Sequence, residues 1–258
     1  MANNLVCELK ENSHVNNEIF TIGIAWGGLA PKAGQFFMLK PLRSSLFLAR
    51  PLSVFEWQPE QKMLRFLVAR RGKGTNELSQ VKLGEKIEIT GPFGNAWADF
   101  LPANNKSIAL VSGGVGIAPL AALVAEKPEV DFHFYAGFKN SFNDKTEEAA
   151  ILGSAYKAKR FIISAEYGMS VLKGRIVDYF DNDPNIYSAV FACGPGAMLN
   201  AIKAKCNKAG LPCFISLERR MACGSGACLG CTVQCIKGNR RCCTDGPIFA
   251  AEELRFDE

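Results

Sequence analysis

Short apolar segments alternate with glycine and proline turns over the first hundred residues, and this pattern predicts β-strands. Helical periodicity is nearly absent from this part, and short strands at such spacing are typical of a small antiparallel barrel. The expected strands are Ile19–Trp26, Gln35–Leu39, Leu52–Trp57, Met63–Ala69 and Lys86–Ile89.

The pattern changes after residues 101–106, which we interpret as a linker. Buried-strand patterns then alternate with helical ones, and this alternation indicates a parallel sheet with helices on both faces. The expected strands are 107–111, 130–135, 161–164 and 186–192, and the expected helices are 118–126 and 197–209. From about residue 212 the chain is rich in Cys and Gly and too irregular for a helix or sheet of its own. The sequence therefore predicts a β + α/β protein: an antiparallel β-barrel (1–101), a parallel-sheet α/β domain (102–211) and a tail (212–258).

Composition narrows the class of protein. The 258 residues are 48% hydrophobic and 21% charged, with a mean hydropathy of +0.04, which excludes a disordered chain. No apolar run reaches the ~18 residues of a membrane span, and the N-terminus lacks the pattern of a signal peptide, so we expect a cytoplasmic protein with no membrane partner. The net charge of +5 comes from scattered basic residues without interleaved aromatics, so we expect no nucleic-acid partner.

Cysteine is the unusual residue: ten occur, and six of them lie between Cys223 and Cys243. A tight cluster of thiols in a chain without a signal peptide indicates a metal site. Cys223, Cys228 and Cys231 have the C-x4-C-x2-C spacing of plant-type [2Fe–2S] proteins, which add a fourth cysteine later in the chain. Zinc is the alternative, but zinc ribbons pair two short knuckles and only one is regular here.

Four short motifs have the composition of phosphate-binding turns. Arg50–Ser53 places an arginine at the end of one strand and Gly72–Thr75 a small-residue turn at the next, so a guanidinium and backbone N–H groups could hold a diphosphate. Gly113–Gly116 and Cys193–Gly196 each connect a strand to a helix, where phosphates and other ligands of parallel sheets bind. Each motif alone is weak, since a hairpin turn or a tight strand–helix turn has the same composition.

The order of these motifs carries a resemblance. RPLS, GKGT, GPFGN (91–95), GGVGIAP and CGPG, in this order, resemble the ferredoxin-NADP⁺ reductase superfamily, in which a barrel binds FAD and the following α/β domain binds a nicotinamide nucleotide. The tail, ERRMACGSGACLGC followed by CTDGPIF, resembles the electron-transfer subunits of type B dihydroorotate dehydrogenase, the iron–sulfur flavoproteins of pyrimidine biosynthesis. The resemblance covers essentially the whole chain.

The resemblance implies specific cofactor contacts. Expected FAD contacts are Arg50, Pro51, Leu52, Ser53, Leu67, Val68, Ala69, Gly74 and Thr75. Expected nicotinamide-side positions are Gly113, Gly114, Gly116, Pro119, Cys193, Gly194 and Pro195. Expected [2Fe–2S] ligands are Cys223, Cys228, Cys231 and Cys243.

The fourth ligand is the most open of these positions. Adjacent residues of an extended segment point to opposite sides, so only one of Cys242 and Cys243 is expected to face the cluster. The resemblance assigns Cys243, which precedes Asp245-Gly246-Pro247. Cys235 is a further competitor, but it lies in a segment that reads as a strand leaving the site.

The implied function is electron transfer. By the resemblance, a catalytic FMN-containing subunit oxidises dihydroorotate, and electrons pass through [2Fe–2S] and FAD of this chain to NAD⁺, in a heterotetramer with two copies of each subunit. This chain is then an oxidoreductase subunit with no catalytic residues of its own. Alternatives are a related subunit of a ferredoxin:NADP⁺ oxidoreductase or hydrogenase, and a zinc-stabilised binding module. The sequence does not decide whether the nicotinamide nucleotide is NADH or NADPH.

Overall fold

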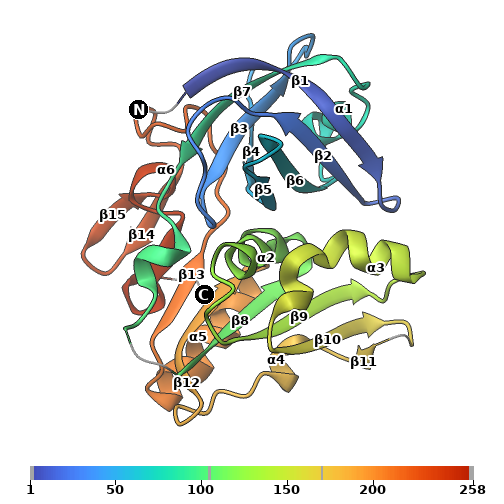
Figure 1. Cartoon of the computed structure of the whole chain (residues 1–258). Helices are drawn as coiled ribbons and strands as arrows, with labels where there is room; N and C mark the ends of the chain where they lie inside the picture. Colours follow the sequence, from blue (N-terminus) through green and yellow to red (C-terminus); the bar gives the residue numbers. More distant parts are fainter. Residues whose placement is uncertain (1–2, 104–105, 170, 256–258) are drawn as a thin grey trace.

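The chain folds into two lobes, one above the other, and its C-terminal segment runs along one side of both (Figure 1). The computed structural model describes residues 3–103, 106–169 and 171–255. Asn104 and Asn105 of the expected linker lie outside the described residues, as do the first two residues of the expected barrel domain and the last three of the tail.

The first lobe is a strongly curved antiparallel sheet with strand order β4-β3-β7-β1-β2-β6-β5. The sequence analysis missed the first strand, β1, because many of its residues are polar and hide the alternation of burial along it. It also predicted one strand, Leu52–Trp57, where the structure has two, β4 and β5. Among the described residues the end strands β4 and β5 are not paired to each other, so the sheet is a half-barrel. Its elements are β1 (Asn3–His14), β2 (Ile19–Ala25), β3 (Phe36–Pro41), β4 (Arg50–Ser53), β5 (Glu56–Gln58), β6 (Met63–Ala69), α1 (Lys73–Ser79), β7 (Lys86–Phe93) and the 3-10 turn η1 (Trp97–Phe100).

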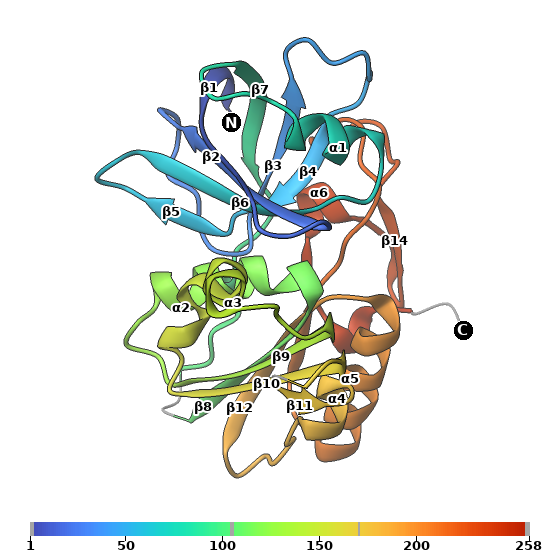
Figure 2. The same cartoon turned by 90° about the vertical axis from the view of Figure 1, so that its right-hand side faces the viewer.

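The second lobe is a seven-stranded sheet of order β11-β10-β9-β8-β12-β13-β16. Its strands run parallel except β16, which is antiparallel to β13, so the sheet is mixed rather than fully parallel. Helices α2 and α3 cover the face toward the first lobe, and α4 and α5 cover the other (Figures 1 and 2). The elements up to the tail are β8 (Ser107–Gly113), η2 (Gly114–Gly116), α2 (Ile117–Glu126), β9 (Phe132–Asn140), α3 (Lys145–Leu152), η3 (Gly153–Lys157), β10 (Arg160–Tyr167), β11 (Leu172–Lys173), α4 (Ile176–Tyr179), β12 (Tyr187–Cys193) and α5 (Gly196–Ala209).

The tail is more regular than the sequence predicted. Two of its segments, β13 (Cys213–Ser216) and β16 (Ile248–Ala250), extend the sheet of the second lobe, and between them lie the hairpin β14 (Thr232–Cys235) and β15 (Gly238–Arg241) and the short helix α6 (Cys242–Asp245). The turn η4 (Ala251–Glu253) ends the ordered elements. The expectation of an irregular tail was wrong because strands of three or four residues are too short to show periodicity and form by pairing with an existing edge. The domain limits at 101 and 211 stay a prediction.

Contacts between residues far apart in the sequence hold the two lobes together and attach the tail to the first lobe. The indole of Trp97 stacks on Phe191 of β12 with ring centroids 4.9 Å apart. Asn95, from the GPFGN motif, binds the backbone of Ile248 in both directions: its side-chain amide donates to the carbonyl at 2.8 Å, and its side-chain oxygen accepts from the N–H at 3.1 Å. The motif therefore joins the end of β7 to the last strand of the other sheet.

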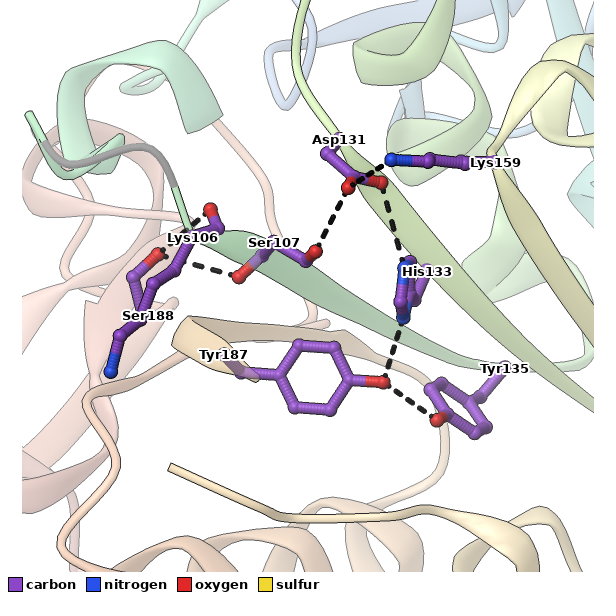
Figure 3. A network of polar contacts seen from close by, with 8 residues as sticks. All are labelled: Lys106, Ser107, Asp131, His133, Tyr135, Lys159, Tyr187 and Ser188. Atoms are coloured by element: carbon purple, nitrogen blue, oxygen red, sulfur yellow. Dashed lines mark hydrogen bonds and ion pairs between the residues drawn. The ribbon is translucent and has the colours of Figure 1, made fainter. Parts of the chain in front are cut away.

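A polar network ties together the amino-terminal ends of the central strands (Figure 3). The hydroxyl of Tyr187 is hydrogen-bonded to the Tyr135 hydroxyl at 2.8 Å and to the His133 ring at 3.0 Å, and Asp131 accepts from Ser107 and Lys159. Burial lowers the pKa of His133, so the ring is neutral at pH 7. This end of a parallel sheet is opposite the ligand-binding end, and the network has a structural role. Among the helices of the described residues, none is both long enough and apolar enough to cross a bilayer.

Candidate functional site

The residues expected at FAD come from two neighbouring parts of the half-barrel. β4 pairs with β3 in the register Leu39↔Arg50, Met38↔Pro51, Phe37↔Leu52 and Phe36↔Ser53, and all four β4 residues are half-buried. On β6, Leu67 and Val68 are buried and Ala69 is half-buried. β4 contacts β6, and β6 contacts η2 of the second lobe, so this surface lies next to the glycine turn expected at the nicotinamide.

Arg50 and the turn before α1 form the part of this surface suited to a diphosphate. The Arg50 Nη1 donates to the carbonyls of Leu48 at 2.6 Å and Ala49 at 3.3 Å. Its Nε–Nη2 edge lies over Gly74, where an added Cβ would collide with the guanidinium. Arg50 thus places a cation beside a glycine turn that offers backbone N–H groups, and this combination suits a phosphate group. The charge of these residues therefore fits the FAD diphosphate.

Thr75 shapes the same turn. Its hydroxyl accepts from the backbone N–H of Arg71 at 2.9 Å and donates to the Gly72 carbonyl at 3.1 Å. The GKGT motif is thus the start of a helix rather than a hairpin turn. A Cβ on Gly72 would meet nothing within 4 Å, so the outer side of the turn is open.

The two glycine turns of the second lobe lie against each other. β8 and β12 are neighbouring parallel strands, so the turns after them meet at the carboxyl edge of the sheet. A Cβ on Gly194 would lie 2.8 Å from the Gly113 nitrogen, and one on Gly113 would lie 2.6 Å from Cδ of Pro195. A Cβ on Gly116 would meet the Cys193 backbone. The glycines are required for this close approach, which brings the motifs to one place.

The other expected nicotinamide-side residues differ in exposure. Gly114 has φ +55° and open space on its outer side, so it could approach a ligand. Cys193 is buried, and burial, with the nearby Glu218 carboxylate, raises the pKa of its thiol. Pro119 is buried in the first turn of α2, where it packs in the core. Its expected role at the nucleotide stays a prediction, as does each of the other assignments.

The four expected cluster ligands form two pairs in the tail. The thiols of Cys231 and Cys243 lie 3.3 Å apart, and the backbone N–H of Cys228 points to the Cys223 sulfur at 3.5 Å. Hydrogen bonds from the N–H groups of Cys228 and Ser225 lower the pKa of Cys223 to about 6, whereas burial raises the pKa of Cys243 to about 11. The two pairs face each other closely enough for Cys223 to act electrostatically on Cys243.

The donor set fits a cluster of two irons. Within residues 3–103, 106–169 and 171–255, no three His, Cys, Asp or Glu side chains gather in a way that could hold one metal ion. A [2Fe–2S] cluster is held by four thiolates around two irons, and the four expected ligands, arranged as two pairs, supply four thiols of this kind.

Two further thiols of the tail, Cys242 and Cys235, were the other candidates for the fourth ligand. Cys242 is fully buried and donates to the Leu217 carbonyl at 3.2 Å, and Cys235 is on β14. The prediction of an extended segment at Cys242-Cys243 was wrong, because both residues belong to the helical turn α6. The two side chains still diverge, since successive residues of a helix point about 100° apart.

The cluster loop, residues 223–231, packs against β3 and β7 of the first lobe, and the tail flanks both lobes (Figure 2). A Cβ on Gly224 would lie 3.0 Å from Met38 of β3 and 3.2 Å from Phe93 of β7. Ala49, directly before Arg50, packs against the same hydrophobic cluster as Cys231 and Cys243. The loop is therefore adjacent to the strand expected at FAD.

Glu218 is a charged residue of this region that the sequence analysis missed. It follows β13 at the carboxyl edge of the sheet, and it acts electrostatically on the Cys193 thiol. Desolvation raises the pKa of Glu218, and the Arg71 cation opposes this rise. Glu218 is the first residue of the ERRMACGSGACLGC motif and follows β13 closely, and this position was the signal in the sequence that could have marked it as a site residue.

Comparisons with known proteins agree with this geometry. Residues 218–255 match the family model described as the iron-sulfur cluster binding domain of dihydroorotate dehydrogenase B. The chain is 35% identical to the "dihydroorotate dehydrogenase B (NAD(+)), electron transfer subunit" of Clostridium acetobutylicum, over 96% of each chain. It is also 35% identical to the subunit with the same name from Caldanaerobacter subterraneus subsp. tengcongensis, over 95% of this chain and 96% of that one.

Solved structures give the same fold. The NADH-dependent reduced ferredoxin-NADP oxidoreductase is similar with a TM-score of 0.80 and 25% identity, covering 99% of this chain and 91% of that one. A ferredoxin NADP+ reductase from Neisseria gonorrhoeae with bound FAD and NADP is similar with a TM-score of 0.63 and 17% identity, covering 80% of this chain and 92% of that one. The second likeness concerns the fold alone.

Proposed function

Since this chain belongs to the family of dihydroorotate dehydrogenase B electron transfer subunits, we propose that it passes electrons from a dihydroorotate-oxidising partner subunit to NAD⁺. Its cofactors are a [2Fe–2S] cluster and FAD. The partner is the FMN-containing catalytic subunit, in a heterotetramer with two copies of each chain. A cytoplasmic location is part of the proposal, supported by ten free cysteines.

One observation carries the proposal: Cys231 and Cys243 share one hydrophobic cluster with Phe36 and Met38 of β3, and Ala49, next to Arg50, packs against it. When bound, a [2Fe–2S] cluster carries single electrons and FAD exchanges one or two, so the pair links one-electron transfer with hydride transfer to a nicotinamide. The chain's own part is to bind these groups and fix their separation.

The residues divide this work. Cys223, Cys228, Cys231 and Cys243 would hold the cluster, and Arg50 with the Gly74–Thr75 turn would hold the FAD diphosphate. The buried Cys193 thiol stays protonated, because burial raises its pKa, so it adds no charge at the edge where a nicotinamide would lie. Gly114, where an added Cβ would meet nothing within 4 Å, leaves the backbone open at this edge.

Reconstitution with the partner tests the proposal. The isolated chain, loaded with iron, sulfide and FAD, is expected to oxidise NADH with an artificial acceptor and to show no turnover of dihydroorotate. The complex with the catalytic subunit from the same organism is expected to reduce NAD⁺ with dihydroorotate. Dihydroorotate oxidation by the isolated chain, free of the partner, would contradict the division of labour.

The likeness to the NADH-dependent reduced ferredoxin-NADP oxidoreductase supports a second candidate, a subunit of an enzyme of that kind. The two candidates differ in the partner that co-purifies from the native host. A ferredoxin-dependent oxidoreductase, with no dihydroorotate-oxidising subunit, would favour the second.

A further inference from the structure

A hydrogen bond joins the two lobes on the side of the molecule opposite the tail. Figure 1 shows the turn between β1 and β2 above α3, on the far side from β14 and β15. Asn16, in this turn, donates from its side-chain amide to Oε1 of Glu147 at 2.5 Å. Glu147 is in the first turn of α3 and is 8% exposed. We call this pair, whose members are 131 positions apart in the chain, the latch.

Each partner of the latch is oriented by its own lobe. The side-chain oxygen of Asn16 accepts from the N–H groups of Glu18 and Ile19, each at 2.8 Å, so the amide nitrogen is left to point away from the turn. Oε2 of Glu147 accepts from the backbone N–H of Asn143 at 2.7 Å, which leaves Oε1 for Asn16. Groups that are oriented in advance lose little freedom when they bind each other.

The turn that carries Asn16 is connected to the surface expected at FAD. Ile19 of β2 pairs with Ala69 of β6, and the Arg70 N–H donates to the Glu18 carbonyl at 2.7 Å. Ala69 is an expected FAD contact, and Arg70 follows it directly. A shift of the turn would therefore move the end of β6.

α3 is connected in the same way to the edge expected at the nicotinamide. The strand before α3 is β9, which lies beside β8 with Gly137 in register with Gly113. Gly113 begins one of the two glycine turns at this edge. The latch therefore links an element next to the FAD surface with an element next to the nicotinamide edge.

A cavity beside the latch shows that close packing does not hold the lobes together at this point. Its volume is about 240 Å³, and its walls come from residues 15–17 of the first lobe and from residues around the start of α3, among them Asn143 and Thr146. Several water molecules, at about 30 Å³ each, would fill this space. At the tail side the lobes are fixed by the stack of Trp97 on Phe191, so loss of the latch would free the opposite side.

We propose that Asn16 and Glu147 are positioning residues for hydride transfer between the nicotinamide and the flavin. By holding the lobes together opposite the tail, the latch sets the distance between the FAD surface and the glycine turns. This role rests on the proposed function, because it takes these two surfaces as the cofactor sites. A misplacement of about 1 Å can slow a reaction about 100-fold, so a loosened latch should slow this step.

A reversal of donor and acceptor tests the latch. Asn16→Asp keeps the oxygen that accepts within the turn but places a second carboxylate against Glu147, and the two charges repel each other. In the double variant Asn16→Asp/Glu147→Gln, the new amide nitrogen can donate across the lobes while its oxygen accepts from the Asn143 N–H. The single variant should therefore open the latch, and the double variant should restore it.

Stopped-flow reduction of the holoprotein by NADH measures the positioning role. In this step NADH loses a hydride, a proton with two electrons, to the bound FAD and becomes NAD⁺. At saturating NADH, the rate in Asn16→Asp should fall about 10- to 100-fold, and the double variant should recover most of it. FAD affinity should be unchanged in both, because Arg50 and the turn before α1 are intact.

Glu148→Gln is the matched control. Glu148 is also 8% exposed and follows Glu147 in α3, but it accepts from Lys145 at 2.6 Å and from the Tyr156 hydroxyl at 2.5 Å, both in the second lobe. Loss of a buried carboxylate that does not bridge the lobes should leave the rate of flavin reduction unchanged.

Hydrogen–deuterium exchange of the full chain detects the latch without NADH. Asn16→Asp should raise the exchange of peptides that cover residues 15–19 and 141–148, and the double variant should restore their protection. Unchanged exchange in Asn16→Asp would overturn the latch, and raised exchange with a wild-type rate of flavin reduction would overturn its positioning role. Wild-type protein that binds FAD but is not reduced by NADH would instead refute the proposed function, and the positioning role with it.

Discussion

The Arg50→Ala variant is the sharpest test of the FAD site. In the structure, Nη1 of Arg50 is engaged by the carbonyls of Leu48 and Ala49, which fixes the plane of the guanidinium. The Nε–Nη2 edge packs on Gly74, which holds the cation beside the turn that would bind the diphosphate. The variant removes both the charge and this orientation.

The magnitude follows from the bond that is lost. Hydrogen bonds to charged groups contribute about 1.5–3 kcal/mol, so the dissociation constant of FAD should rise about 10- to 150-fold. Arg50→Lys keeps the positive charge but loses the planar guanidinium. Its FAD affinity should therefore lie between that of Arg50→Ala and that of the wild type. Gly74→Ala should also weaken binding, because its Cβ displaces the guanidinium.

Fluorescence titration of the apoprotein with FAD measures these constants. Arg43→Ala is the matched control, since Arg43 is an exposed arginine of the loop that precedes β4. Unchanged FAD affinity in Arg50→Ala, with the control also unchanged, would show that the diphosphate is bound elsewhere.

Three further predictions concern the rest of the chain. Cys243→Ser should abolish the normal EPR signal of the reduced cluster and lower the iron and sulfide content, whereas Cys242→Ser should keep both; the opposite result would reverse the assignment of the fourth ligand. Gly116→Ala should weaken NADH binding at least tenfold in a nucleotide titration, since its Cβ meets the facing turn, and equal affinity would show that the turns adapt. Glu11 has a lowered pKa through its hydrogen bond to Arg65, so its contribution to stability is present above the unfolded-state pKa and lost as the pH falls through the folded-state pKa. Urea unfolding of Glu11→Gln should show a loss of about 0.5–1 kcal/mol at pH 7 that becomes smaller as the pH is lowered through the acid range; a loss that does not change with pH would contradict an ionic contribution.

Local pattern was enough to predict the two-part architecture. Met63–Ala69 is a strand with the predicted limits, and the helix predicted from residue 118 begins one residue earlier, at Ile117. In both segments the burial pattern of the element agrees with the spacing of its apolar residues. Where the sequence fails, as in the polar strand Asn3–His14, pairing with two neighbours decides the structure.

The candidate site was predictable as a set of motifs but not as an arrangement. Glycines that allow two turns to meet are visible in the sequence, yet the contact between Gly194 and Gly113 depends on strands that are neighbours only in the sheet. Glu218 is the first residue of the ERRMACGSGACLGC motif, but its raised pKa comes from burial in the folded chain, which the Arg71 cation of the first lobe opposes. The helical turn at Cys242 and Cys243 is likewise set by the segments around it.

The position of the last strand bears on how the protein matures. β16 pairs with β13 and binds Asn95 of the first lobe. Ribosomes deliver the N-terminal part first, so the barrel strands can pair before β16 has been synthesised. The edge of the second sheet at β13 therefore stays open until the segment from Cys243 to Ala250 has been made. The same late segment supplies the expected fourth cluster ligand and the strand that covers this edge.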